Sequence, residues 1–295
     1  KQLCPDLIFV GSHMEYYKSV SMQIHEIFHE YTDMIEPLAL DEAFLDVTEN
    51  KKNIPLAVDV AREIKKEIKE KLGLVASAGI SYNKFLAKIA SDYKKPDGLY
   101  TIHPNRAPAF ISKLPIEAFW GIGKVTARKM HSLGIHTGAD LKKCTQTFLT
   151  RNFGKAGTLY HDFANGIDPR MVTPERTRKS VGCESTFEND LTNYIAVIIE
   201  LYHVTTELIF RLEKSDFKGH TLTLKIKFHD FTQKTRSITM AHELRTKQDI
   251  LPLAKKLLKD LELTQFRIRL LGLSVSNPFE ELTTDGPLQL RINFD

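Results

Sequence analysis

The chain has little cysteine, a single tryptophan and no long apolar run. Its three cysteines, Cys4, Cys144 and Cys183, lie far apart, and their odd number argues against a disulfide framework. No spacing of cysteine and histidine resembles a zinc site. No apolar run approaches the ~20 residues that a transmembrane helix needs, and no signal peptide is recognisable. These absences exclude a membrane protein and a secreted disulfide scaffold, so we expect a soluble protein of a reducing, cytoplasmic compartment.

The charge of the chain is unevenly distributed. Its 295 residues, 42% hydrophobic, provide material for two or three modules, and the net charge is +4. Residues 1–103 carry 13 Lys and Arg against 16 Asp and Glu, residues 104–171 carry 10 against 4, and residues 172–295 carry 18 against 17. The basic middle segment suits a phosphate-backbone partner, although an ordinary solvated surface would also account for an excess of this size.

The apolar pattern predicts an α+β protein with several domains. The elements expected in residues 1–103 are a helix near 15–32, a strand pair around 41–42, a helix from 57 that Gly73 ends, a strand at 75–80 and a helix at 83–93. Glycine-punctuated short helices follow in 104–171, and 172–179 reads as a polar linker. The last elements are a strand at 180–187, a helix at 194–214, strands at 221–229 and 235–240, a helix at 249–262 and a strand at 267–276. This βαββαβ order indicates a small sheet with helices on one side.

Two adjacent carboxylates, Asp41 and Glu42, lie between apolar segments with strand character. A charge in such a place is costly unless something pairs with it. Oxygen ligands suit Mg²⁺, which proteins hold through one or two carboxylates together with substrate phosphates. The alternative is a hairpin turn whose acids are simply solvated, and for an isolated Asp-Glu pair that alternative is the commoner one.

The segment around Gly121 and Gly123 has the form of a helix–hairpin–helix. Two glycines one residue apart let the backbone turn tightly and approach a ligand closely. The next helix presents free N–H groups to an anion, and Lys124, Arg128 and Lys129 add positive charge nearby. Contacts of this kind hold a nucleic-acid backbone without reading its sequence. The segment therefore predicts a DNA contact, while Gly-x-Gly also closes ordinary helical corners.

Two other basic segments carry weaker signals. Lys95 opens the turn Lys95-Pro96-Asp97-Gly98, where it could reach a triphosphate beside a magnesium site. Alone, such a residue is more often a solvated turn lysine. The run Arg178-Lys179-Ser180 could follow a nucleic-acid backbone or be linker charge.

The C-terminal stretch ends in a short apolar pattern formed by Gln289, Leu290, Ile292 and Phe294. It is either a linear peptide that docks into a hydrophobic pocket or a last edge strand. No Ser/His/Asp or Cys/His arrangement indicates nucleophilic catalysis.

Taken together, these motifs resemble the Y-family translesion DNA polymerases, most closely the bacterial members. The resemblance runs nearly end to end, through Leu3-Cys4-Pro5, Glu36 to Asp46, Ala76 to Ile80, Asn83 to Asp92, Lys95 to Gly98, Gly121 to Lys124 and Arg178 to Gly182. It implies a partial palm at 1–103, a helix–hairpin–helix thumb at 104–171, a linker at 172–179, a little finger at 180–277 and a tail at 278–295. It also implies magnesium-dependent, low-fidelity addition of dNTPs to a primer 3′ end on damaged templates.

The resemblance also implies roles for individual residues. Asp41 and Glu42 would hold the metals, two Mg²⁺ ions in the complete site, and Lys95 would steady the triphosphate. The duplex backbone would be held by the thumb and the little finger, through Gly121, Gly123, Lys124, Arg128, Arg178, Lys179 and Ser180. The tail peptide Gln289 to Phe294 resembles the family's sliding-clamp peptide. We expect a monomeric bacterial cytoplasmic enzyme that works at the nucleoid.

The chain departs from the family pattern in two places. The family begins with a strand that carries a further metal-binding Asp, followed by an aromatic residue that excludes ribonucleotides and by the fingers, and none of these precedes Lys1. A two-metal site clamps both the attacking and the leaving oxygen, so we expect the parent protein to be a polymerase and this chain alone to be nearly inactive. The smaller departure is Trp120, where the family hairpin usually has proline.

Two rival functions differ in class. A non-catalytic module that binds DNA and a clamp would keep the DNA-binding hairpin but would not add dNTPs to a primer. A helix–hairpin–helix glycosylase would need a catalytic residue beside the hairpin and a base-flipping pocket; Asp140 is the nearby candidate and reads as a helix cap.

Overall fold

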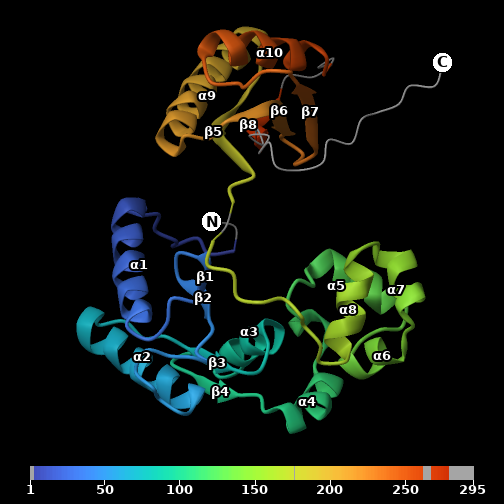
Figure 1. Cartoon of the computed structure of the whole chain (residues 1–295). Helices are drawn as coiled ribbons and strands as arrows, with labels where there is room; N and C mark the ends of the chain where they lie inside the picture. Colours follow the sequence, from blue (N-terminus) through green and yellow to red (C-terminus); the bar gives the residue numbers. More distant parts are fainter. Residues whose placement is uncertain (1–2, 176, 262–266, 279–295) are drawn as a thin grey trace, which may run out of the picture. The chain divides into compact units, whose positions relative to one another are not determined.

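Contacts along the chain divide the molecule into two units, residues 1–176 and 177–295, in the computed structural model (Figure 1). The structure describes residues 3–175, 177–261 and 267–278. Each unit is described by itself below. Within these ranges, no helix combines the length and the hydropathy that a membrane crossing requires.

The first part of unit 1 is an α/β layer. Its elements are α1 (Met14–His29), β1 (Ile35–Ala39), β2 (Glu42–Leu45), α2 (Ala57–Leu72), β3 (Ala78–Ile80), α3 (Lys84–Tyr93) and β4 (Leu99–Thr101). β1 and β2 pair antiparallel, whereas β3 and β4 pair parallel in a separate two-stranded sheet. Gly73, at φ 67°, ends α2 as predicted, because glycine takes the left-handed conformation without a Cβ clash. The side chain of Asn83 accepts the amide of Leu86 and so begins α3.

The facing sides of α1 and α2 form the core of this layer. Ile27 of α1 and Tyr31, two residues after that helix, pack with Val60, Ile64 and Ile68 of α2, all at most 7% exposed. The two predicted helices are thus confirmed, and each buries one face. The first turns of α1 are more open, since Tyr17 is 46% exposed.

The second part of unit 1 is helical. Its elements are η1 (Pro104–Arg106), α4 (Ala107–Lys113), η2 (Ile116–Ala118), α5 (Lys124–Ser132), α6 (Gly138–Lys143), α7 (Gln146–Phe153) and α8 (Ala156–Ala164). Its core includes α3 of the first part, since the ring of Phe85 stacks on that of Phe163 with 4.0 Å between centroids. Gly157 lets α8 cross α7 closely, because a Cβ there would lie 2.3 Å from the backbone of Leu149.

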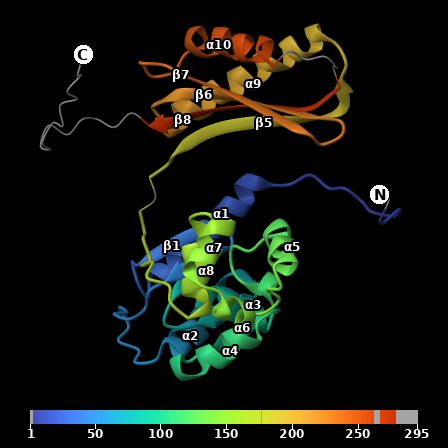
Figure 2. The same cartoon turned by 90° about the vertical axis from the view of Figure 1, so that its right-hand side faces the viewer.

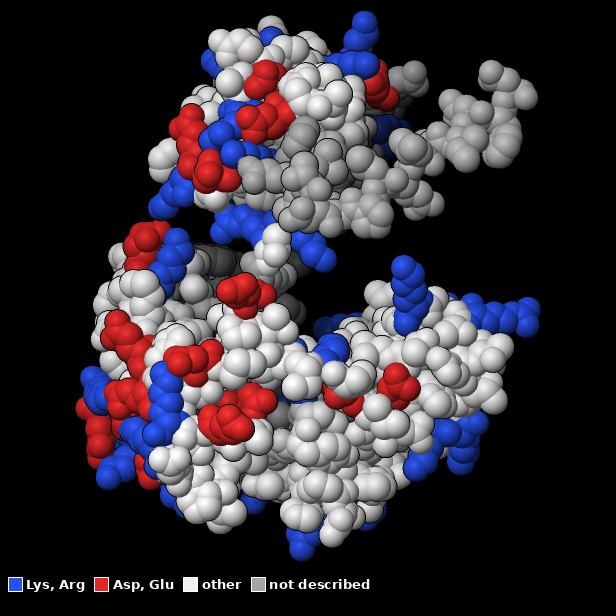
Figure 3. All heavy atoms as spheres, in the orientation of Figure 1, with Lys and Arg blue, Asp and Glu red and all other residues white. Residues whose placement is uncertain are grey.

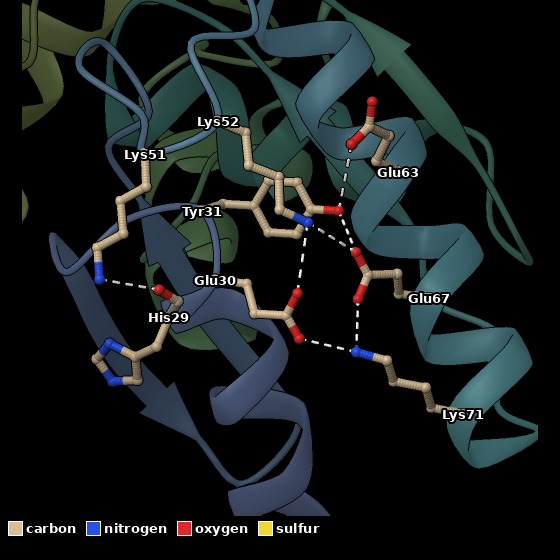
Figure 4. Close-up of polar contacts among 8 residues, drawn as sticks. All are labelled: His29, Glu30, Tyr31, Lys51, Lys52, Glu63, Glu67 and Lys71. Atoms are coloured by element: carbon tan, nitrogen blue, oxygen red, sulfur yellow. Dashed lines mark hydrogen bonds and ion pairs between the residues drawn. The ribbon is translucent and has the colours of Figure 1, made fainter.

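A network of charges around Tyr31 joins the ends of α1 and α2 (Figure 4). Tyr31 is fully buried and its hydroxyl donates to the carboxylate of Glu67. The Lys52 ammonium lies 3.8 Å from the centroid of the Tyr31 ring and 3.1 Å from Glu67. Lys71 bridges Glu67 at 2.7 Å and Glu30 at 2.8 Å. Burial raises the pKa of Tyr31 to about 12, so its hydroxyl remains a donor over the working range of pH.

Replacing Glu67 by glutamine should make unit 1 less stable by about 2 kcal/mol at neutral pH. Burial alone would raise the pKa of Glu67, but hydrogen bonds from Lys71, Tyr31 and Lys52 hold that pKa at about 2. A depressed carboxylate pKa stabilises the fold above the ordinary pKa and loses this effect as the pH falls. The stability difference between wild type and Glu67→Gln, measured by urea unfolding, should therefore be full above about pH 5 and shrink towards pH 2. Glu63→Gln, one turn earlier on α2, is the matched control, and equal losses in both variants would contradict the assignment.

Unit 2 has the predicted βαββαβ order. Its elements are β5 (Ser180–Leu191), α9 (Tyr194–Ser215), β6 (Gly219–Phe228), β7 (Gln233–Thr239), α10 (Lys247–Lys259) and β8 (Ile268–Pro278). The strands form one antiparallel sheet in the order β5-β8-β6-β7. Both helices cover the same face of this sheet (Figure 2), where Leu222, Leu224 and Ile226 of β6 are fully buried. These residues occupy every second position of β6, which places them on one face of the sheet.

Candidate active site and nucleic-acid interface

Asp41 and Glu42 lie at the tip of the β1–β2 hairpin. Leu40 and Asp41 form the turn, and Glu42 opens β2 opposite Ala39. Ser21 of α1 donates to the Leu40 carbonyl at 2.5 Å and holds the turn. Both carboxylates line one cavity of about 1550 Å³. The predicted strand pair is confirmed, and it points two acidic side chains at a common space.

A row of alternating charges connects Glu42 to Lys95, which lines the same cavity. Lys88 of α3 lies 3.1 Å from Glu42 and 3.2 Å from Asp92, and Lys95 lies 2.8 Å from the other oxygen of Asp92. Partial burial alone would lower the pKa of Lys88, but the hydrogen bonds with Glu42 and Asp92 raise it above its usual value. The cavity thus brings both predicted carboxylates and the predicted phosphate ligand together. Lys88, to which the sequence pattern gave no role, neutralises one of the carboxylates.

The turn that carries Lys95 is held from two sides. Lys65 of α2 donates to the carbonyls of Asp97 at 2.6 Å and Gly98 at 2.9 Å. The amide of Gly98 donates to the hydroxyl of Ser77 at 3.0 Å. A Cβ on Gly98 would lie 2.4 Å from the carbonyl oxygen of Lys94, so this position requires glycine. Lys65 is another residue that the sequence did not single out, because it acts from a helix about thirty positions away.

The donor set fits a hard cation in part. Carboxylate oxygens at the tip of a hairpin are ligands that Mg²⁺ accepts, with substrate phosphates and water completing its shell. Among the residues that the structure describes, no three or more acidic, histidine or cysteine side chains gather to hold a metal ion. A metal ion at this turn would find the two carboxylates of Asp41 and Glu42, and a complete two-metal site would need further oxygen donors.

An apolar trough continues this cavity between β2 and β3. Val60, Ile64 and Ile68 of α2 form part of its lining, together with residues of both strands. β2 and β3 belong to different two-stranded sheets, so in the described part of unit 1 each has a ladder partner on one side only. Residues of both strands line the same trough.

The hairpin around Gly121 leaves open space on its outer side. Gly121 takes a φ of 86°, which favours glycine, whereas Gly123 has ordinary extended angles and forms the N-cap of α5. A Cβ at either glycine would meet no atom within 4 Å. Packing within the protein therefore does not explain the missing side chain at Gly123. The hairpin and the uncapped first turn of α5 have the room and the donors for an anion such as a phosphate.

The charges near the hairpin divide into two groups. Lys124 and Arg128 are exposed on α5, as the DNA-contact prediction requires. Lys129 instead donates to the carbonyl of Asn152 and lies 5.0 Å from the centroid of the Phe153 ring. Asp140 forms a capping box with Thr137 at the start of α6, which confirms its role as a helix cap.

Figure 3 shows how charge is arranged on one face of unit 1. Acidic and basic side chains are mixed over α1 and α2, whereas Lys and Arg prevail over the helices of the second part. This agrees with the basic excess counted in residues 104–171.

In unit 2, Arg178, Lys179 and Ser180 are exposed, and Ser180 opens β5. The sheet face opposite α9 and α10 is rich in hydroxyl groups, which the sequence analysis did not notice. Thr221 and Thr239 lie 2.9 Å apart across β6 and β7, as do Thr223 and Ser237 at 2.8 Å. The predicted clamp peptide, Gln289 to Phe294, lies outside the described residues.

Comparison with known families gives three matches along the chain. The impB/mucB/samB family matches residues 1–92, the IMS family HHH motif matches 104–135, and the impB/mucB/samB family C-terminal domain matches 178–292. Together they include the carboxylate turn, the glycine hairpin and the βαββαβ sheet.

Similar proteins extend over nearly the whole chain. It is 66% identical over 295 residues to DNA polymerase IV of Bacteroides fragilis, spanning 100% of this chain and 81% of that protein. It is 59% identical to DNA polymerase IV of Akkermansia muciniphila, over 95% of this chain and 78% of that protein.

Solved structures agree with these sequence matches. A Y-family DNA polymerase chimera superposes with a TM-score of 0.83 and 27% identity, over 94% of this chain and 80% of that one. A post-insertion binary complex of Dbh DNA polymerase gives a TM-score of 0.58, also at 27% identity, over 94% and 81%. The chain belongs to the Y-family of DNA polymerases.

Proposed function

We propose that this chain carries the palm, thumb and little finger of a translesion polymerase that adds dNTPs to a primer 3′ end on damaged DNA. The observation that carries the proposal is the single cavity shared by Asp41, Glu42 and Lys95. The palm would extend to residue 103 and the thumb to 171, with a linker at 172–179 and the little finger at 180–277. The relatives named DNA polymerase IV and the complexes of Dbh DNA polymerase support this assignment.

The reaction would be an in-line displacement in which the primer 3′-oxygen bonds to the α-phosphorus of the dNTP and loses its proton to water, while the bond to the α,β-bridging oxygen breaks and pyrophosphate leaves. Two Mg²⁺ ions, when bound, would lower the pKa of the primer 3′-hydroxyl and neutralise charge on the phosphates. Asp41 and Glu42 would hold them. Lys95 would leave Asp92 for the triphosphate, which offers more negative charge. Lys88, already beside Glu42, would limit repulsion between this carboxylate and the incoming phosphates.

The carboxylate set needs a third member, so we infer that this chain alone is nearly inactive. The apolar trough suits an extended segment, because residues of β2 and β3 line it and each of these strands has a ladder partner on one side only in the described part of unit 1. A strand there with an acidic residue near Asp41 would complete the ligands. We use "completed enzyme" for a protein in which such a strand, with its acidic residue, is joined to this chain.

DNA would be held by both units, each through its own surface. In unit 1 the hairpin of Gly121 and Gly123 would bind phosphates, with Lys124 and Arg128 beside it. In unit 2 the run Arg178 to Ser180 and the hydroxyl-rich sheet face would follow the backbone. The tail peptide Gln289 to Phe294 remains a prediction for a sliding-clamp contact, which deletion of these residues and a clamp pull-down would test.

Primer extension with magnesium tests the proposed function. The completed enzyme should extend a primer opposite an undamaged and an abasic template base, and this chain alone should bind the same DNA while extending little. If the completed enzyme binds primer-template normally and extends nothing, the polymerase proposal fails and a non-catalytic DNA-binding module takes its place.

Replacing Lys124 by alanine should weaken duplex binding about equally across sequences. One lost phosphate contact lowers the slope of log K against log salt by about one unit. Fluorescence anisotropy over a series of salt concentrations measures this slope. Lys113→Ala, an exposed lysine at the end of α4, is the matched control. A slope unchanged in Lys124→Ala would locate the DNA elsewhere.

A further inference from the structure

Trp120, the single tryptophan of the chain, immediately precedes the glycine hairpin. It is partly buried and contacts two other parts of unit 1. The Arg170 guanidinium carbon lies 4.5 Å from the centroid of the Trp120 ring, and the ring of Phe44 meets it edge to face at 5.4 Å. Phe44 lies on β2, two residues after Glu42. The Trp120 indole thus contacts β2 and the segment that follows α8, and its backbone leads directly into the glycine hairpin.

Arg170 is held so that its flat guanidinium stays on the indole. Its Nε and Nη2 donate to the two oxygens of Asp168 at 2.7 and 2.8 Å. The Asp168 side chain has no exposed surface, and it also accepts the amide of Phe85 in the first turn of α3 at 3.0 Å. A bidentate pair fixes both the position and the plane of a guanidinium. The stack on Trp120 is therefore tied to α3.

Phe44, the other contact of Trp120, is also held in place. It is 7% exposed, and the Lys84 ammonium lies 5.3 Å from the centroid of its ring. Lys84 also donates to Glu36 of β1 at 2.5 Å and to the carbonyl of Met171 at 3.1 Å. Glu36 accepts the amide of Thr173 at 2.9 Å. The segment around Arg170 is thus bound to β1 and α3, so the partners of Trp120 are themselves tied together.

We propose that Trp120 is a positioning residue that fixes the DNA-holding hairpin relative to the carboxylates of β2. The proposal rests on the proposed function, because it concerns the same reaction. A primer 3′-hydroxyl must lie within reach of the metal site, and a shift of about 1 Å in such an alignment can cost about a hundredfold in rate. The hairpin would hold the duplex and β2 carries Glu42, while Trp120 directly precedes the hairpin in the chain and its ring contacts Phe44 of β2.

The placement also explains why an aromatic residue occurs at this position of the hairpin. A proline would stiffen the turn but present no broad surface to Arg170 or Phe44. The indole offers the ring with the strongest attraction for a guanidinium. Where the family usually has proline, this chain thus holds the hairpin through the side-chain contacts of Trp120.

Single-turnover dNTP incorporation in the completed enzyme tests the proposal. At saturating DNA and dNTP, Trp120→Ala should lower the rate ten- to a hundredfold, while the primer-template Kd changes less than about threefold. Trp120→Phe should recover most of the rate. Arg170→Lys keeps the charge but loses the bidentate, planar contact, so it should lower the rate in the same direction without removing the indole. Phe148→Ala, a 38% exposed aromatic on α7, is the control.

The fluorescence of Trp120 provides a readout on this chain that does not depend on activity. Arg170→Lys should increase quenching of the indole by acrylamide and shift its emission to longer wavelength, since the guanidinium no longer covers the ring. Primer-template DNA should change the emission of the wild type.

The outcomes separate this inference from the proposed function. If Trp120→Ala and Arg170→Lys incorporate dNTP within twofold of wild type at saturation, the positioning role is wrong even when their thermal stability falls. If the completed wild-type enzyme binds DNA but incorporates nothing, the proposed function fails instead.

Discussion

Replacing Asp41 by alanine should abolish nucleotide addition by the completed enzyme. Asp41 lies at the tip of the β1–β2 hairpin and lines the proposed catalytic cavity. Removing one ligand charge leaves two cations and a triphosphate with too few carboxylates, and a loss of about 10³-fold or more is the expected size for such a change. Primer-template affinity should stay within about twofold, because the hairpin and the basic side chains that we propose to hold DNA are untouched.

Single-turnover incorporation and anisotropy, measured on the same preparations, separate the two effects. Glu26→Ala removes an exposed carboxylate of α1 that does not line the cavity and should leave the rate unchanged. Raising the Mg²⁺ concentration should rescue Asp41→Ala little, because the lost ligand also sets the position of the ion. A mutant with a normal rate would rule out the metal role of Asp41.

The second large effect is on stability, and it concerns Glu36. Glu36 binds the ammonium of Lys84, which is only 9% exposed, and the amide of Thr173. Burial alone would raise the pKa of Glu36, but the hydrogen bonds of Lys84 and Thr173 lower it below its usual value. Glu36→Ala leaves a buried cation without its counter-ion, so unit 1 should lose about 3 kcal/mol of unfolding free energy.

Urea unfolding followed by the emission of Trp120 measures this loss, since the one tryptophan lies in unit 1. Glu26→Ala, an exposed glutamate of α1, should change the free energy by no more than about 0.5 kcal/mol. The double variant Glu36→Ala with Lys84→Met should regain much of the loss, because it no longer buries an unpaired charge. A single variant as stable as wild type would show that Lys84 finds another partner.

The elements that were predicted from the sequence are determined by residues that lie next to one another in the chain. The acids at 41 and 42 adjoin their own strands, so the hairpin and its tip were visible together. Gly73 and Asn83 end and begin helices through local backbone chemistry. The hairpin of Gly121 is likewise local, and the structure shows that its glycines leave open space.

The contacts that sequence reasoning missed join distant positions. Glu42 and Lys88 are 46 residues apart, and they meet because the Lys88 side chain on α3 reaches the start of β2. Arg170 reaches Trp120 only because the chain returns from α8 past α3. β4 has three residues that pair with β3 in parallel, too few for an alternating pattern to reveal.

Metal-directed cleavage of the completed enzyme is the most direct test of the central claim, that Asp41 and Glu42 hold the catalytic ions. Fe²⁺ in place of Mg²⁺, with ascorbate and peroxide, generates hydroxyl radicals at the ion and cuts the nearest backbone. The account predicts cuts at the β1–β2 turn around Asp41, suppressed by excess Mg²⁺ and absent in Asp41→Ala. Cuts confined to other segments of an enzyme that still extends primers would contradict it.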